Sequence, residues 1–208
     1  MRRWLLIRHG ASIWNKEQRI QGQIDVPLSD LGREQVRALA RRLSGEDICA
    51  CFTSPLMRAK ETAHLLIQGM NRSIPLIVLE ELKERQFGEW EGRLIDEVAT
   101  QDPVWNDWVK SDQMSCPPGG ETIEDFSART WGAIETIREQ VPWGSLMVAG
   151  HGGSLKAIIC HLIGLPMSSI SRMSLGNGSL TIVEEREGSG WLIVYNDTCS
   201  FINGTAKK

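Results

Sequence analysis

Continuous apolar runs alternate with longer segments of helical periodicity along the 208-residue chain. Four runs have the length and composition of buried strands, namely residues 4–7, 48–53, 74–79 and 145–150. Segments of helical length lie between or beside them, most clearly residues 30–43, 121–138 and 154–163. Because strands that alternate with helices form parallel sheets covered on both faces, the pattern predicts one three-layer α/β/α sandwich with a mostly parallel central sheet.

Capping residues indicate where three of the helices begin. The predicted caps are Ser29 for residues 30–43, Ser54 with the first-turn Pro55 for a helix that carries Arg58, and Thr122 with Asp125 for residues 121–138. The stripes expected to be buried are Leu31, Leu39 and Leu43 in the first of these helices, and Ile123, Phe126, Thr130, Ile134 and Ile137 in the last. Each helix therefore has a defined face to pack against the sheet.

The remaining segments extend this sandwich without adding a second domain. Residues about 93–120 contain two short helical patterns followed by a turn rich in proline and glycine, and we interpret them as an insertion within one domain of residues 1–203. The last predicted elements are the two strands of a hairpin, residues 177–184 and 191–196, and a disordered polar tail, residues 204–208.

The net charge and the cysteines argue against a nucleic-acid-binding, membrane or secreted protein. A formal net charge of −3 gives no general attraction for nucleic acid or an anionic membrane, so any anion site must be a local group of Arg and His side chains. No apolar stretch approaches the ~20 residues that span a bilayer, and we expect neither a secretion signal nor a membrane segment. Five scattered cysteines suit reduced thiols in the cytoplasm, with Cys49 and Cys51 on one face of a strand as small buried side chains.

The first strand ends abruptly in Arg8, His9 and Gly10, so that a cation, an imidazole and a flexible glycine follow the apolar run. Ligands of open α/β sheets bind where strands end. His9 alone is compatible with an ordinary core histidine, but burial of Arg8 beside an imidazole is unfavourable unless an anion compensates the charge. The sequence therefore predicts an anionic ligand at this strand end.

A second strand end repeats this arrangement, because residues 145–150 lead into His151 and two glycines before an apolar helix. Parallel strands end at the same edge of a sheet, so His9 and His151 are able to meet in one crevice. Arg58 is expected in the first turn of its helix, where free N–H groups and the helix dipole already favour an anion. We interpret the two remaining histidines, His64 and His161, as structural.

Four separated motifs resemble those of one family. They follow the order found in the histidine phosphatase superfamily, in the branch that includes cofactor-dependent phosphoglycerate mutase, and they span nearly the whole chain. Residues 21–29 and 117–122 are similar to the phosphatase members of that family, α-ribazole phosphatase and broad-specificity phosphatases among them. The four motifs are residues 8–15, 53–63, 82–92 and 151–152.

The resemblance implies roles for single residues. His9 becomes the nucleophile that carries a phosphohistidine, and Glu84 becomes the proton donor, with Glu81 and Glu91 as alternatives in the same acidic loop. The implied catalytic set is His9, Glu84, His151, Arg8 and Arg58, and the implied substrate-binding set is Asn15, Gln21, Gly22, Arg8 and Arg58. No metal and no other cofactor is implied.

The activity that follows is metal-independent hydrolysis of a small phosphomonoester. A neutral imidazole can attack phosphorus if its other nitrogen is held protonated, usually by a backbone carbonyl. Phosphoglycerate mutase is the alternative, but residues 94–120 have Lys110 as their single cation and carry Trp105 and Trp108, which suits a less charged organic group. These tryptophans are expected either to line the pocket or to pack in a core.

Two further classes of protein fit the residues less well. A non-catalytic phosphate binder would need no proton donor, and a zinc hydrolase using the two histidines lacks further ligands at suitable spacing. The sequence is compatible with a homodimer and does not fix the oligomeric state.

Overall fold

The computed structural model describes residues 1–198, so the predicted tail at 204–208 and the predicted domain end at 203 lie outside the described residues. Within residues 1–198 one sheet holds six strands in the order β3-β2-β4-β1-β5-β6. The first four strands are parallel, and β5 and β6 are each antiparallel to their neighbours. The strands are β1 (Arg2–Arg8), β2 (Ile48–Thr53), β3 (Leu76–Val78), β4 (Gly144–Gly150), β5 (Leu180–Arg186) and β6 (Ser189–Asp197).

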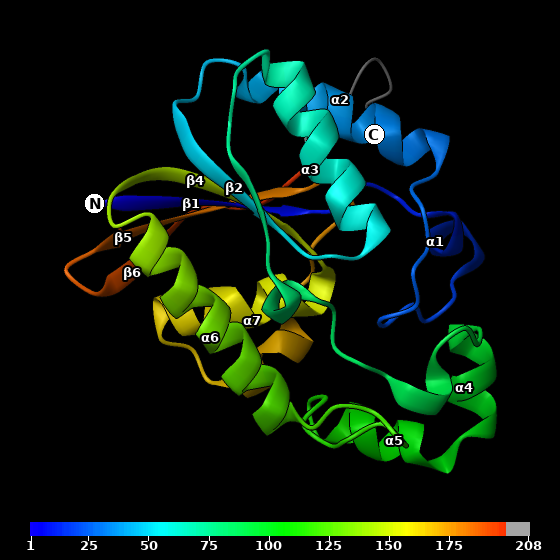
Figure 1. Cartoon of the computed structure of the whole chain (residues 1–208). Helices are drawn as coiled ribbons and strands as arrows, with labels where there is room; N and C mark the ends of the chain where they lie inside the picture. The colour runs from blue at the N-terminus through cyan, green and yellow to red at the C-terminus, as the bar shows by residue number, and fades with distance from the viewer. Residues whose placement is uncertain (199–208) are drawn as a thin grey trace, which may run out of the picture.

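Helices cover both faces of this sheet, which confirms the three-layer sandwich (Figure 1). Leu5 and Ile7 of β1 pack into the layer that contains α2 and α3, whereas Trp4 and Leu6 pack into the layer of α6 and α7. Successive side chains of a strand point to opposite faces, so a strand buried on both faces needs a continuous apolar run. The helices are α1 (Ile13–Glu17), α2 (Asp30–Leu43), α3 (Met57–Met70), α4 (Ile95–Gln101), α5 (Pro103–Lys110), α6 (Ile123–Gln140) and α7 (Gly152–Ile163).

Several predicted boundaries are confirmed by the structure. Ser29 and Thr122 cap α2 and α6 through their side-chain oxygens, as the sequence predicts. All five residues of the predicted α6 stripe are buried. The C-terminal hairpin is present as the antiparallel pair β5 and β6.

The start of α3 differs from the prediction. Met57 is its first residue and Leu56 its N-cap, with no side-chain capping bond, so Ser54 and Pro55 do not begin the helix. The hydroxyl of Ser54 instead lies 2.9 Å from His151 Nε2 and accepts a 3.2 Å hydrogen bond from the Leu56 N–H. The predicted cap therefore belongs to the strand end near the paired histidines.

Smaller differences have local causes. Leu31, which the sequence predicts to be buried, is 61% exposed. The buried face of α2 is formed by Gly32, Val36, Leu39, Ala40 and Leu43, and Leu31 lies outside this face. Cys49 is exposed while Cys51 is buried, since a register shift between Ile48 and Ala50 breaks the alternation of β2. The third strand, Leu76–Val78, is shorter than the predicted residues 74–79.

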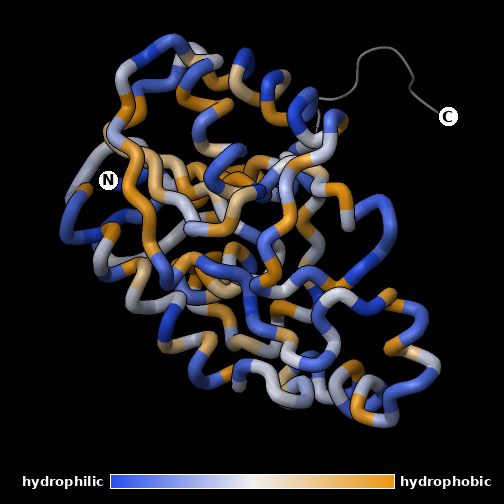
Figure 2. The backbone as a smooth tube through the Cα atoms, turned by 45° about the vertical axis from the view of Figure 1, so that its right-hand side comes forward, coloured by the Kyte–Doolittle hydropathy of each residue, from blue (hydrophilic) through white to orange (hydrophobic). Residues whose placement is uncertain are grey.

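The insertion is a helical projection at one end of the sandwich, where α4 and α5 lie apart from the sheet (Figure 1). Its small apolar cluster is separate from the two layers of core around the sheet. Figure 2 shows hydrophobic segments gathered in the middle of the molecule and hydrophilic ones along the outer loops. None of the helices in residues 1–198 is long and apolar enough to cross a membrane.

Candidate active site

The two strand-end histidines lie side by side. Arg8 pairs with Gly150 in the parallel register of β1 and β4, so the next residue of each strand leaves the sheet at the same edge. The ring centroids of His9 and His151 are 5.3 Å apart in an edge-to-face arrangement. The topology thus brings together two residues that are distant in the sequence.

His9 is buried as a neutral imidazole. Its Nδ1 lies 2.7 Å from the carbonyl oxygen of Gly10, and because a carbonyl only accepts hydrogen bonds, Nδ1 carries the ring proton. Burial, together with the positive charges of Arg8 and Arg58, lowers the pKa of His9 well below its usual value. The Nε2 lone pair is therefore available for bonding.

Gly10 is required by the backbone packing behind this imidazole. A Cβ atom at position 10 would lie 2.4 Å from the carbonyl oxygen of Gly32 at the start of α2. The turn after β1 can therefore pass against α2 only without a side chain.

Two arginines from different elements flank His9. Arg58, in the first turn of α3, is 1% exposed and donates to the carbonyl oxygens of Gly22 at 2.7 Å and Ile24 at 2.8 Å. Arg8, at the end of β1, donates to the carbonyl oxygen of Leu175. Burial lowers the pKa of Arg58 to about 10, so it stays charged at neutral pH.

Buried side-chain nitrogens at this site lack hydrogen-bond partners within residues 1–198. The Nε atoms of Arg8 and Arg58 and the Nδ1 atom of His151 have no hydrogen-bond partner among the described residues. Burial, followed by the charge of Arg58, lowers the pKa of His151 well below its usual value. Buried polar atoms are rarely left unpaired, so these nitrogens indicate where an anionic ligand would bind.

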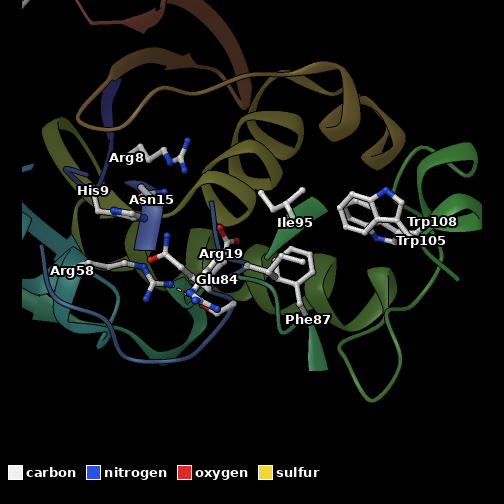
Figure 3. Close-up of a pocket in the computed structure, with 13 residues that line it drawn as sticks. Arg8, His9, Asn15, Arg19, Arg58, Glu84, Phe87, Ile95, Trp105 and Trp108 are labelled. Atoms are coloured by element: carbon white, nitrogen blue, oxygen red, sulfur yellow. Dashed lines mark hydrogen bonds between the residues drawn. The ribbon is translucent and has the colours of Figure 1, made fainter. Parts of the chain in front are cut away.

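Glu84 is the carboxylate that faces the two arginines across the pocket (Figure 3). Its oxygens accept hydrogen bonds from the N–H groups of Gly153 at 2.9 Å and Ser154 at 3.1 Å, in the first turn of α7. A Cβ atom on Gly153 would lie 2.3 Å from Glu84 Oε1. The amino-terminal turn of the helix after His151 thus fixes this side chain.

The two alternative carboxylates do not line this pocket. Glu91 accepts hydrogen bonds from the N–H groups of Gln23 at 3.0 Å and Phe87 at 2.9 Å, which joins two loops. The loop carbonyl of Glu81 accepts a hydrogen bond from Arg129. Glu84 is therefore the acidic candidate that the geometry favours.

All five residues of the predicted substrate-binding set line the pocket, which has a volume of about 250 Å³. The side-chain oxygen of Asn15 accepts hydrogen bonds from the Ser12 N–H at 2.9 Å and from Asn177 Nδ2 at 3.2 Å. Gln21 accepts a hydrogen bond from Ser12, and Gly22 contributes the carbonyl that holds Arg58. The amide nitrogen of Asn15 makes no hydrogen bond within residues 1–198.

Aromatic and aliphatic side chains form the outer wall of the pocket (Figure 3). Trp105 and Trp108 line it, whereas Trp90 is fully buried beneath them. The remaining residues of the lining, which the sequence does not predict, are Arg19, Ile20, Phe87 and Ile95. No local pattern distinguishes them from ordinary loop or helix residues.

The other histidines lie elsewhere. His64 is exposed on α3, and His161 Nε2 lies 3.1 Å from the carbonyl oxygen of Ser127. In residues 1–198 no group of three or more His, Cys, Asp or Glu side chains is placed to hold a metal ion.

A strand-end pocket of this kind, with buried cations around a neutral imidazole, defines an α/β enzyme that acts on phosphate esters. Residues 4–198 match the model of the histidine phosphatase superfamily (branch 1), and the chain belongs to that family.

Known relatives have both phosphatase and mutase names. The chain is 33% identical over 194 residues to the Photorhabdus laumondii protein named "Probable phosphoglycerate mutase GpmB", covering 90% of this chain and 89% of that protein. It resembles the structure of α-ribazole phosphatase from Shigella flexneri with a TM-score of 0.86 and 28% identity, covering 94% of this chain and 96% of that one. A mycobacterial glucosyl-3-phosphoglycerate phosphatase matches with a TM-score of 0.85 and 28% identity, covering 94% and 99%.

Proposed function

We propose that this protein is a metal-independent phosphomonoesterase that hydrolyses a small organic phosphate through a phosphohistidine at His9. The observation that carries the proposal is the 2.7 Å hydrogen bond from His9 Nδ1 to the Gly10 carbonyl. It leaves Nε2 unprotonated near the positive charges of Arg8 and Arg58, as a nucleophile for phosphorus must be.

The proposed reaction has two displacements. Nε2 of His9 attacks phosphorus while the bond to the alcohol oxygen breaks, and Glu84 gives that oxygen a proton. Water then attacks the phosphohistidine, Glu84 takes a proton from the water, and the phosphorus–nitrogen bond breaks to release phosphate. Glu84 thus ends each cycle in its starting protonation state.

The surrounding donors stabilise the charge that develops. Phosphoryl transfer spreads negative charge over the three equatorial oxygens, so catalysis depends on positive groups placed around them. Arg8, Arg58 and His151 supply the unpaired buried nitrogens, and Asn15 supplies an amide.

Phosphoenzyme trapping tests this proposal. Wild-type protein treated with chelator should release phosphate from p-nitrophenyl phosphate and form an acid-labile, base-stable phosphoenzyme. His9→Ala should lose both turnover and labelling. Turnover in the His9 variant would refute the mechanism, and phosphate binding without turnover in the wild type would indicate a non-catalytic binder.

Phosphoglycerate mutase is the second candidate, favoured by the names of curated relatives that are 30–33% identical. The insertion favours the phosphatase, because Lys110 is the single cation of residues 94–120 and the pocket wall that they contribute is aromatic. Incubation with 3-phosphoglycerate and 2,3-bisphosphoglycerate decides between the two. Interconversion of phosphoglycerates without net phosphate release would establish the mutase.

A further inference from the structure

Two carbonyl groups of one turn fix the guanidinium of Arg58. Its Nη2 atom donates to the Gly22 carbonyl oxygen at 2.7 Å, and its Nη1 atom donates to the Ile24 carbonyl oxygen at 2.8 Å. A guanidinium is planar, so two bonds to acceptors on one short segment set its orientation as well as its position. The Nε atom has no hydrogen-bond partner within residues 1–198. The place of this turn therefore decides how Arg58 presents its free donor to an anion in the pocket.

The Glu91 carboxylate holds this turn against the loop that follows Glu84. Glu91 Oε1 accepts hydrogen bonds from the Gln23 N–H at 3.0 Å and from the Phe87 N–H at 2.9 Å. The contact is close, because a Cβ atom on Gly22, whose φ is +49°, would lie 1.9 Å from the same oxygen. One carboxylate oxygen is thus the point at which the turn is attached to the neighbouring loop.

Backbone pairing joins the two loops at their base and not at the turn. The Ile20 N–H donates to the Arg93 carbonyl oxygen at 3.0 Å, and the Ile20 carbonyl oxygen accepts a 2.8 Å hydrogen bond from the Gly92 N–H. Further along, the Gln23 N–H has no backbone acceptor within residues 1–198 and donates to the Glu91 carboxylate instead. The Glu91 side chain therefore supplies the acceptor that backbone pairing does not provide there.

The Glu84 side chain is held by other groups. Its carboxylate accepts hydrogen bonds from the first turn of α7, and the Glu84 carbonyl oxygen accepts hydrogen bonds from Arg129 and from Gln23 Nε2, each 3.1 Å long. The Glu91 carboxylate does not line the catalytic pocket. The two carboxylates are thus connected to different parts of the site, Glu84 to the pocket itself and Glu91 to the turn that binds Arg58.

We propose that Glu91 is a positioning residue for Arg58, acting through the turn of residues 22–24, and that it is not a proton donor. The assignment rests on the proposed phosphatase function and deepens it, because it separates the roles of two carboxylates in one acidic loop. This role requires a side chain of the right length with an oxygen that accepts two hydrogen bonds. A proton donor would instead require an ionisable carboxyl group.

Two substitutions of Glu91 separate these requirements. Glu91→Gln keeps the length and an accepting oxygen, so kcat/KM should stay within about threefold of wild type. Glu91→Asp keeps the ionisable group but is one methylene shorter, and it should lower kcat/KM about ten- to a hundredfold, the range for loss of a hydrogen bond to a charged group. A proton donor would give the opposite order.

The kinetic signature of Glu91→Asp identifies the group that it disturbs. Its loss in kcat/KM should be the same for p-nitrophenyl phosphate and glycerol phosphate, because Arg58 acts on the phosphoryl group and not on the leaving group. Calorimetry should show weaker binding of inorganic phosphate to Glu91→Asp. In an Arg58→Met background the same substitution should change kcat/KM by less than about threefold, because the side chain that Glu91 positions is then absent.

Glu89→Ala is the matched control, because Glu89 is an exposed carboxylate of the same loop. It should alter neither kcat/KM nor the affinity for phosphate. Glu91→Gln and Glu91→Asp should both unfold cooperatively near the Tm of wild type, since each retains a polar side chain at a half-buried position.

Three results would overturn the assignment. A loss in Glu91→Gln as large as that in Glu91→Asp would show that the ionisable group matters rather than its reach. Wild-type kinetics in Glu91→Asp would make Arg58 independent of Glu91, and an undiminished effect in the Arg58→Met background would make Glu91 a purely structural residue. Failure of the phosphatase proposal is seen separately, as the absence of phosphoenzyme in wild type, while the affinity for inorganic phosphate still tests Glu91.

Discussion

The surroundings of His9 and His151 set the pKa of each imidazole. Both imidazoles are buried near Arg58, and both have a pKa well below that of a free histidine. The same positive field that keeps them neutral favours an oxyanion next to them. His64, exposed on α3, lacks this environment. The sequence identifies the residue types, while burial and neighbouring charges decide which histidine is reactive.

These buried imidazoles should make stability depend on pH. In the unfolded chain they take up protons near pH 6.5, whereas in the folded protein they stay neutral to lower pH, so the unfolded state binds more protons between the two pKa values. The stabilising contribution is therefore present above about pH 6.5 and is lost as pH falls, by about 1.4 kcal/mol per pH unit for each imidazole.

Thermal unfolding in phosphate-free buffer measures this effect. Tm should be lower at about pH 5.5 than at about pH 7.5, and His151→Gln should reduce the difference. His64→Gln is the control and should leave it unchanged. An equal pH dependence in wild type and His151→Gln would contradict the prediction.

Glu84 should matter according to the leaving group. A poor leaving group such as an alkoxide needs a proton as its bond to phosphorus breaks, whereas p-nitrophenolate does not. Because kcat/KM reports formation of the phosphoenzyme and not its hydrolysis, Glu84→Gln should lower kcat/KM for glycerol phosphate by about 10²–10³ and that for p-nitrophenyl phosphate by less than about tenfold. If the activity falls by the same factor on both substrates, Glu84 only shapes the pocket and is not the proton donor. Glu81 and Glu91 would then be tested as the proton donor.

At the level of elements, α6 positions the loop that carries Glu84. Arg129 of α6 donates to the carbonyl oxygens of Glu81 at 2.7 Å, Lys83 at 2.9 Å and Glu84 at 3.1 Å. Its guanidinium also pairs with Glu121, and both side chains are less than one-fifth exposed, at 18% and 12%. A rigid helix therefore holds the backbone from which the proposed proton donor projects.

Substitution of Arg129 should affect activity in the same way as substitution of Glu84. Arg129→Met should lower kcat/KM for glycerol phosphate at least about tenfold more than kcat/KM for p-nitrophenyl phosphate, because a loosened loop misplaces Glu84. Combined with Glu84→Gln, its effect on the alkyl ester should be much less than additive.

Arg138→Met is the matched control, since Arg138 lies on the same helix but pairs with Glu135 and Glu185. It should lower Tm without changing the ratio of the two substrates. If Arg129→Met lowers the activity on both substrates by the same factor, Arg129 has a purely structural role.

Sequence patterns predict elements better than they predict such contacts. The strands that end at His9 and His151 are recognisable because strands buried on both faces are continuously apolar. Arg129 is 48 positions from Glu81, and no periodicity relates them. Ser54 has the residue type of a helix cap but lies against His151 instead. Side chains that act across the fold are set by topology, which local patterns do not encode.

On the scale of the whole molecule, the sheet and the insertion have separate cores. The sheet is packed on both faces by large apolar clusters. The insertion depends on a small cluster of Ile20, Trp90, Val98 and Trp108 with the neighbouring Phe87, Val104 and Trp105. The proposed phosphate-binding centre at the strand ends thus adjoins a separately packed wall, an arrangement that allows the organic group to vary without a change in the chemistry.

Trp108 should therefore stabilise the insertion and not the sheet. It is 7% exposed and contacts the rings of Phe87, Trp90 and Trp105 at centroid distances of 6.1, 5.6 and 5.2 Å. Trp108→Ala should cost about 3–5 kcal/mol locally, because it leaves a cavity in this small cluster. Hydrogen exchange should accelerate across α4 and α5 and remain unchanged in β1 and β4, while KM for p-nitrophenyl phosphate rises more than kcat falls.

The control for Trp108→Ala is Trp143→Ala, which removes a tryptophan that is 72% exposed and outside the insertion cluster. This change should alter neither the exchange rates nor the kinetics. Accelerated exchange throughout β1 and β4 in Trp108→Ala would show that insertion and sheet unfold as one cooperative unit. If the acceleration stays within α4 and α5, the pocket wall can open while the strand ends keep the two histidines in place, and the kinetic cost of the substitution should then fall on substrate binding rather than on phosphoryl transfer.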